Sequence, residues 1–191
     1  MKVYAPQEDS FLLEEIILRE NLKNKVCLDI GCGSGIQTKA MLVAGAQKVF
    51  AVDINPSALL ATQKIAVAQK ERVRLIESDL FSSLKKELFD FIVFNPPYLP
   101  SEEIKWRDLD GGKKGREIID KFIQQFPAHL AAKGKAFLLI SSLNNKEEII
   151  SLLKEKGFFV EVVTQKKLFF EELFVLSISR EQSIDLDEIS F

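Results

Sequence analysis

The sequence predicts an α/β fold, with a mostly parallel sheet covered by helices on both faces. Short apolar runs typical of buried strands alternate along the chain with helical segments, which is the pattern of such folds. The first apolar run ends in a glycine-rich turn, as in many parallel sheets that bind nucleotides. The last two runs, 158–163 and 173–178, have no helix between them and should pair antiparallel.

The first half of the chain is expected to contain three strands, at 26–30, 49–54 and 73–76, with helices at about 8–19, 38–44 and from Asn55 to Lys70. The third helix has a clear start, because Asn55 is a good N-cap and Pro56 suits the first helical position. The third strand is short.

The second half begins with a fourth strand at 89–94, which is strongly apolar and therefore expected to be central. A polar stretch then runs from Tyr98 to about Lys114, and a loop of that length is usually functional. The elements expected after it are a helix at 116–130, a fifth strand at 136–140 and a helix at 146–156 that ends at Gly157, followed by the final strand pair.

Composition indicates an ordinary globular protein of 191 residues with a net charge of −2. The chain therefore has no overall positive charge that would favour binding to nucleic acid. Residues 181–191 hold four acids and no base, and we predict a single domain over 1–180 followed by an acidic, solvated extension over 181–191. Cys27 and Cys32 form no metal motif and fit a reducing compartment. No signal peptide or membrane span is recognisable, so we expect a cytoplasmic protein.

The glycine-rich turn reads Asp-Ile-Gly-Cys-Gly-Ser-Gly over 29–35. Glycines at Gly31, Gly33 and Gly35 let the backbone approach a ligand closely, although a tight strand-to-helix turn alone would also use them. The spacing departs from the dinucleotide fingerprint, because Ile36 occupies the position after Gly35. The turn therefore indicates a nucleotide-like ligand without identifying it.

Three acids near strand ends narrow the choice of ligand. Asp53 ends the second strand, where a carboxylate can accept both ribose hydroxyls of an adenosine or cap the next helix. Asp79 follows the third strand and could accept from an exocyclic adenine amine. Asp29 could hold a cationic amino group and would repel a pyrophosphate. The electrostatics favour S-adenosylmethionine (SAM) over NAD, and no metal is expected.

The tetrapeptide Asn95-Pro96-Pro97-Tyr98 follows the fourth strand, at the edge where such sheets bind ligands. Two prolines make the backbone rigid and leave only carbonyl acceptors, to which Asn95 adds a side-chain carbonyl and Tyr98 an aromatic face. This set could hold both N–H bonds of a planar amide or amine and aim its nitrogen at a methyl donor. Positioning of this kind can lower a barrier by up to ~7–11 kcal/mol. A rigid turn is the alternative.

The glycine-rich turn over 29–35, the segments that begin at Asp53 and at Asp79, and the tetrapeptide over 95–98 together resemble the HemK-like class I methyltransferases. These enzymes methylate the glutamine of the Gly-Gly-Gln motif in peptide-chain release factors. The start of the chain (Val3-Tyr4 and Glu8 to Leu13) and the segment from Gly111 to Glu117 resemble the short eukaryotic and archaeal branch. The resemblance implies a Rossmann-like fold with seven strands in the order 3-2-1-4-5-7-6. It also implies a SAM site lined by Ser10, Asp29, Gly31, Asp53, Ile54, Asp79, Leu80 and Asn95, with the glutamine held by residues 95–98.

By the same resemblance, a small zinc-binding activator subunit would cover the third-strand edge, where Val73, Leu75 and Ile76 accompany unpaired backbone groups. The rival reading is an N6-adenine methyltransferase acting on RNA or DNA, because an exocyclic amine also needs two acceptors. The nearly neutral charge argues against it. A SAM-binding scaffold without activity would have no use for the tetrapeptide. His129 is expected to be structural.

Overall fold

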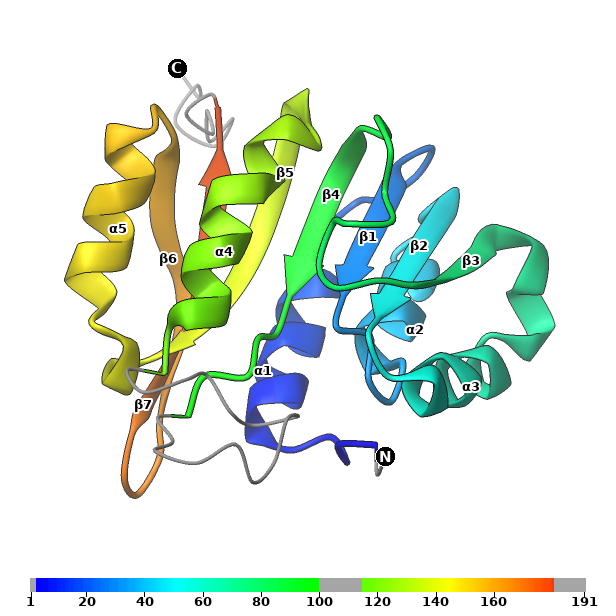
Figure 1. Ribbon diagram of the computed structural model, residues 1–191. Helices are drawn as coiled ribbons and strands as arrows, with labels where there is room; N and C mark the ends of the chain where they lie inside the picture. Colours follow the sequence, from blue (N-terminus) through cyan, green and yellow to red (C-terminus); the bar gives the residue numbers. More distant parts are fainter. Residues whose placement is uncertain (1–2, 100–114, 181–191) are drawn as a thin grey trace, which may run out of the picture.

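The computed structural model describes residues 3–99 and 115–180, and these form a seven-stranded sheet with helices on both faces (Figure 1). The strand order β3-β2-β1-β4-β5-β7-β6 confirms the predicted order. Strands β1 to β5 pair in parallel, and β7 pairs antiparallel with both β5 and β6, as the short final connection predicts. The third strand therefore forms one edge of the sheet.

The strands are β1 (Val26–Ile30), β2 (Lys48–Asp53), β3 (Val73–Glu77), β4 (Phe89–Phe94), β5 (Leu130–Ser141), β6 (Phe159–Lys167) and β7 (Glu172–Ser179). The α-helices are α1 (Glu8–Ile17), α2 (Ile36–Val43), α3 (Pro56–Ile65), α4 (Glu117–Gln125) and α5 (Lys146–Glu155). Three short 3₁₀ segments accompany them: η1 (Val67–Arg72), η2 (Phe126–Ala128) and η3 (Ser142–Asn144).

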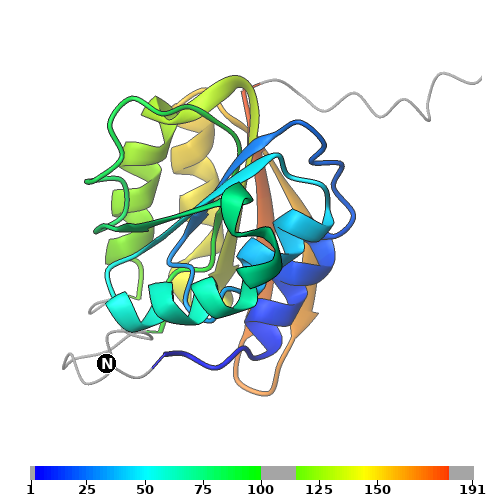
Figure 2. The same cartoon turned by 90° about the vertical axis from the view of Figure 1, so that its right-hand side faces the viewer.

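The sheet lies between two helical layers, with α1 and α2 on one face and α4 and α5 on the other (Figure 2). Both faces are therefore buried, which explains why β4 is apolar almost throughout. Phe91 and Phe137 meet edge to face in the sheet, with ring centroids 5.0 Å apart, and Phe122 of α4 packs on Phe94 at 5.0 Å. This aromatic core fixes the end of β4, where the tetrapeptide begins.

Several element boundaries differ from the sequence prediction. The helix that starts after Asn55 ends at Ile65 instead of Lys70, and η1 follows it, with a non-helical φ of −137° at Gln69. The helix expected to reach Leu130 ends at Gln125, because Pro127 has no N–H to continue the helical ladder. The backbone then enters β5 at Leu130, six residues before the predicted start at Ala136.

Strand β6 continues to Lys167, past the predicted end at Val163. Its second half, Thr164 to Lys167, is polar because it lies at an exposed edge, yet its backbone pairs with β7. The predicted extension at 181–191 and the polar loop at 100–114 lie outside the described residues. Within residues 3–99 and 115–180, no helix is long and apolar enough to cross a membrane.

Candidate active site

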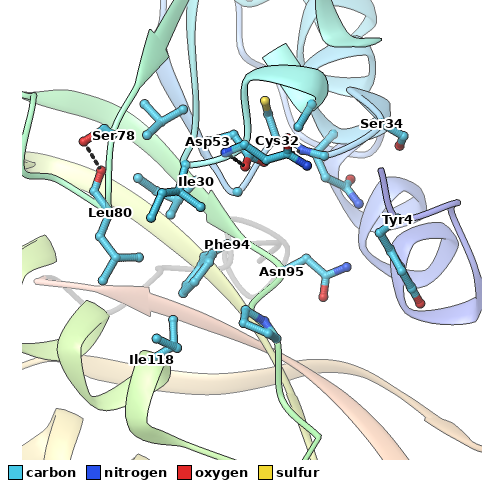
Figure 3. Close-up of a pocket in the computed structure, with 18 of the residues that line it drawn as sticks. Tyr4, Ile30, Cys32, Ser34, Asp53, Ser78, Leu80, Phe94, Asn95 and Ile118 are labelled. Carbon is cyan, nitrogen blue, oxygen red and sulfur yellow. Dashed lines mark hydrogen bonds between the residues drawn. The ribbon is translucent and has the colours of Figure 1, made fainter. Parts of the chain in front are cut away.

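A cavity of about 540 Å³ opens at the carboxyl ends of the parallel strands (Figure 3). This is the edge at which open α/β sheets bind ligands, and the volume suits a nucleoside-sized molecule. Loops after β1, β2, β3 and β4 contribute to its wall, together with α1, α2 and α4. The predicted site residues that line it are Ser10, Gly31, Gly33, Asp53, Ile54, Asp79, Leu80, Asn95 and Pro97.

The glycine turn forms the floor of the cavity and needs its glycines. Gly31, Gly33 and Gly35 have φ values of 66°, 52° and 85°, in the left-handed region that other residues rarely adopt. A Cβ added at Gly35 would also lie 2.9 Å from the Cα of Thr62 in α3. The Cys32 amide donates to the Val52 carbonyl at 2.9 Å, so the turn is held against β2.

Asp53 is held in place by the turn that it faces. One carboxylate oxygen accepts from the Gly33 amide at 2.9 Å, and the other accepts from the Asn55 amide at 2.8 Å. Each carboxylate oxygen can accept a further hydrogen bond. The Asn55 side chain accepts from the Ser57 amide at 3.0 Å, which confirms its N-cap role and separates it from that of Asp53.

The loop after β3 brings Asp79 and Leu80 to the opposite wall. Leu80 has a φ of 48°, unusual for a residue with a branched side chain, and its carbonyl accepts from the Ser78 hydroxyl at 3.0 Å (Figure 3). Strain of this kind concentrates at ligand sites. The Asp79 side chain is exposed at the cavity wall, where it can meet a ligand amine.

The Asn95 amide is oriented by a buried carboxylate. Its Nδ2 donates to Asp9 Oδ2 at 3.0 Å, while its Oδ1 is buried and has no hydrogen-bond partner among the described residues. Asp9 is only 4% exposed, and its Oδ1 accepts from the Ser10 amide at 2.7 Å and from the Tyr4 hydroxyl at 3.2 Å. Burial and the neighbouring Asp9 raise the pKa of Tyr4, so its hydroxyl stays a donor. The acceptor of Asn95 is left for a ligand.

A second unpaired acceptor lies on the same cavity wall. Gln37, in the first turn of α2, donates from Nε2 to the Ser10 carbonyl at 2.9 Å, and its buried Oε1 has no partner. Among the described residues, three buried side-chain atoms are unpaired, and two of them, Gln37 Oε1 and Asn95 Oδ1, belong to residues of this cavity. Buried polar atoms are almost always paired in folded proteins, so this concentration points to a ligand with two donor groups.

Three predicted site residues do not line the cavity. Asp29 is 1% exposed and accepts from the Thr38 hydroxyl at 2.6 Å, so its carboxylate lies behind the glycine turn. Burial raises its pKa to about 7, more than the Thr38 hydrogen bond lowers it. Pro96 and Tyr98 are buried, and burial also raises the pKa of the Tyr98 hydroxyl. In this structure the side chains of these three residues therefore do not line the cavity.

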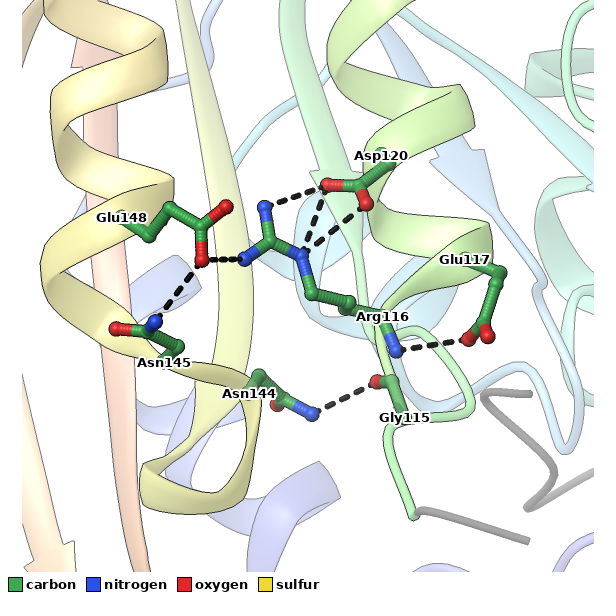
Figure 4. A network of polar contacts seen from close by, with 7 residues as sticks. All are labelled: Gly115, Arg116, Glu117, Asp120, Asn144, Asn145 and Glu148. Atoms are coloured by element: carbon green, nitrogen blue, oxygen red, sulfur yellow. Dashed lines mark hydrogen bonds and ion pairs between the residues drawn. The ribbon is translucent and has the colours of Figure 1, made fainter. Parts of the chain in front are cut away.

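The backbone of the tetrapeptide is fixed from the neighbouring connection. Asn144 of η3 donates from Nδ2 to the Tyr98 carbonyl at 2.8 Å and to the Gly115 carbonyl at 2.7 Å. Next to it, Arg116 joins α4 to α5 through Asp120 at 2.9 Å and Glu148 at 2.7 Å (Figure 4). This network makes the carboxyl edge around Tyr98 rigid.

Sequence reasoning missed several residues of the site: Tyr4, Asp9, Gln37, Ile118, Lys121 and Asn144. Gln37 carries a usable signal, because it lies in the first helical turn after a glycine-rich loop. His129 lies outside the cavity, where its ring stacks on Phe81 at 4.8 Å and its Nδ1 pairs with the Glu87 carbonyl.

The strand order, with a glycine turn after β1, acids after β2 and β3 and an Asn-Pro-Pro-Tyr segment after β4, defines the class of protein as a class I methyltransferase. The model of the methyltransferase small domain family matches residues 9–170. The chain belongs to this family.

Relatives of the chain support the resemblance to the HemK-like group. A protein of Methanocaldococcus jannaschii with the provisional name protein N5-glutamine methyltransferase is 42% identical over 94% of this chain and 92% of its own length. Human methyltransferase HEMK2 is 32% identical over 93% of this chain and 90% of its own.

A solved structure has the same fold along almost the whole chain. It is the E. cuniculi Mtq2–Trm112 complex, described as responsible for methylating the translation termination factor eRF1. Its matching chain is 29% identical to this one with a TM-score of 0.78, over 95% of this chain and 100% of that chain.

Proposed function

We propose that this protein transfers a methyl group from SAM to the side-chain amide nitrogen of the glutamine in the Gly-Gly-Gln motif of a class I release factor. The observation that carries the proposal is the fixed amide of Asn95. Asp9 holds its Nδ2, while its Oδ1 is a buried acceptor without a partner among the described residues, on a residue that lines the cavity. A primary amide with two N–H groups is the type of substrate that such an acceptor serves.

The residues of the tetrapeptide position the amide for attack. Asn95 Oδ1 accepts one N–H bond of the glutamine, and a carbonyl of the rigid Pro96-Pro97 backbone is proposed to accept the other. Holding both N–H bonds aims the nitrogen lone pair at the methyl group. The N–C bond forms as the S–C bond breaks, and the nitrogen then loses one of its two protons, so no strong base is needed.

The cavity fits SAM, which when bound supplies a methyl group on a positively charged sulfur. Asp53 lines the cavity at the end of β2, where a carboxylate suits the ribose hydroxyls, and Asp79 lies at the wall for the adenine amine. We assign the amino group of the cofactor to Gln37 Oε1 in place of the predicted Asp29, because Gln37 presents an unpaired acceptor and Asp29 is turned away. Gly31, Gly33, Ser10, Ile54 and Leu80 complete the proposed cofactor site.

The edge strand β3 is the proposed site of the activator subunit. Its backbone pairs only with β2 in the described sheet, and Val73, Leu75 and Ile76 are only partly buried. Arg74 covers the Phe50 ring at 5.4 Å and pairs with Glu87 at 3.9 Å, which protects part of this edge. The relative in the E. cuniculi complex is joined to Trm112. We propose a comparable small zinc-binding partner here, and a cytoplasmic location with the translation machinery.

The proposed function is tested by offering alternative acceptors in parallel. The protein, with and without the activator, is incubated with labelled SAM and either a class I release factor or RNA and DNA. Label in the release factor, lost when its Gly-Gly-Gln glutamine becomes alanine, supports the proposal. Label that enters only nucleic acid would establish the rival N6-adenine activity, and its salt dependence would show phosphate contacts.

A further inference from the structure

The hairpin between β6 and β7 presents two phenylalanines to solvent. Phe169 is 91% exposed and Phe170 is 86% exposed, and their rings meet edge to face with centroids 4.5 Å apart. The next most exposed large apolar side chains in residues 3–99 and 115–180 are Val67 at 65% and Val43 at 64%. An exposed aromatic pair is costly in solubility and is typical of a surface that binds a partner.

The hairpin tip is held in a defined position by the rest of the fold. The Leu168 amide donates to the Glu171 carbonyl at 2.8 Å, and the Leu168 side chain packs against the core. Lys166 forms an ion pair with Glu8 at the start of α1. The two rings therefore project from a supported turn, which reduces the entropy lost when they are covered by a partner.

The tip lies at the same edge of the sheet as the active site. Strand β6 runs antiparallel to β7 and β7 antiparallel to β5, so β6 ends at the carboxyl edge, where the hairpin projects (Figure 1). At the hairpin base, Ser141 donates to Glu171, and its Oγ accepts from the Leu143 amide at 3.2 Å. The same connection carries Asn144, which holds the Tyr98 carbonyl at 2.8 Å. A partner that covers the active site can therefore also contact the hairpin tip.

We infer that Phe169 and Phe170 form the docking surface for the body of the release factor whose glutamine enters the cavity. This inference rests on the proposed function. One glutamine side chain offers little area for binding, and a net charge of −2 gives weak electrostatic steering. Most affinity must then come from contacts outside the cavity, and aromatic side chains including phenylalanine are enriched at the centres of protein interfaces.

The charges around the tip favour a protein over nucleic acid. Lys166 is neutralised by Glu8, and Lys167 is accompanied by Glu171 and Glu172 at the base of the hairpin. Two bases against three acids provide no phosphate-binding surface, and stacking on single-stranded nucleic acid is normally combined with a basic groove. The contact with the release factor is therefore expected to be apolar and nearly independent of salt.

The test is the double variant Phe169→Ser and Phe170→Ser, compared with Val43→Ser as the matched control. Val43 is also exposed, but it ends α2, which starts at the glycine turn and runs back to the opposite edge of the sheet. We expect the double variant to raise KM for the release factor at least tenfold, with kcat, SAM affinity and thermal stability unchanged. Val43→Ser should leave all four unchanged, and Phe169→Leu with Phe170→Leu should give an intermediate KM.

An unchanged KM in the double variant, while the wild type methylates the release factor, would overturn the docking surface and leave the proposed function intact. A loss of RNA binding or of self-association in place of the KM effect would assign the tip to RNA or to a second copy of the chain, and would also overturn it. If the wild type methylates no release factor, the proposed function fails first and the inference fails with it.

Discussion

Replacing Asp9 with asparagine should slow methyl transfer without a matching loss of cofactor affinity. Asp9 uses one oxygen to accept from the Ser10 amide and the Tyr4 hydroxyl, and the other to accept from Asn95 Nδ2 at 3.0 Å. Asparagine has only one carbonyl oxygen, so its NH₂ group must face either Ser10 or the Asn95 NH₂. The second arrangement turns the Asn95 acceptor away from its aimed position.

The expected cost follows from the loss of a buried hydrogen bond to a charged group, about 1.5–3 kcal/mol. If this loss falls on the transition state, kcat should drop roughly ten- to a hundredfold. The assay is steady-state methylation of the release factor, with SAM affinity measured by calorimetry.

Two controls show whether Asp9 acts through Asn95. Glu8→Gln removes the neighbouring carboxylate, which pairs with Lys166 at the surface, and should leave kcat unchanged. Asp9→Asn added to Asn95→Ala should cost almost nothing further, because the oriented amide is already gone. A kcat near that of the wild type in Asp9→Asn would refute the reasoning, as would full additivity in the double variant.

Four further predictions concern the active site, the edge strand β3 and the buried Asp29. Asn95→Ala should lower kcat at least ~10²-fold in the same assay, the scale of losing one preorganised polar contact, while SAM still binds. Asp53→Ala should weaken SAM binding by ~2–3 kcal/mol, and unchanged calorimetry would show that Asp53 only shapes the turn. Leu75→Glu should prevent co-purification with the activator, and a complex that survives would place the partner elsewhere. Burial raises the pKa of Asp29 to about 7, so between about pH 4 and 7 the folded chain holds a proton that the unfolded chain has lost. The stability of the wild type should therefore fall as the pH rises through this range. Asp29→Asn should remove this part of the fall in thermal unfolding, which is on the order of 1 kcal/mol or more.

Much of the fold could be predicted because local sequence signals agree with the final structure. The Asn55-Pro56 start of α3 and the apolar β4 are determined by nearby residues, and both appear where expected. The errors lie where tertiary pairing overrides composition. The polar end of β6 looks like a loop until β7 pairs with it. Leu130 was expected to end a helix and residues 131–135 were assigned to no strand, whereas β5 starts at Leu130, which pairs with Phe89 of β4.

Ser10 of α1 was predicted through the family resemblance, and local patterns predicted the site where its residues follow a strand end. Asp53, Asp79 and Asn95 lie there, and each lines the cavity. Asp9 and Asn144 act through contacts across 86 and 46 positions of sequence, which no local pattern reveals. Asp29 was expected at the ligand because it directly precedes the glycines, whereas its side chain is 1% exposed and accepts from the Thr38 hydroxyl of α2.

The most direct test of the central claim is mass spectrometry of the release-factor peptide that contains the Gly-Gly-Gln motif. The factor is incubated with isotopically labelled SAM, the activator and either the wild-type protein or Asn95→Ala. We expect one labelled methyl group on the side-chain amide nitrogen of that glutamine with the wild type, and a greatly reduced amount with the variant. An unlabelled glutamine with the wild type, or equal labelling by Asn95→Ala, would contradict it.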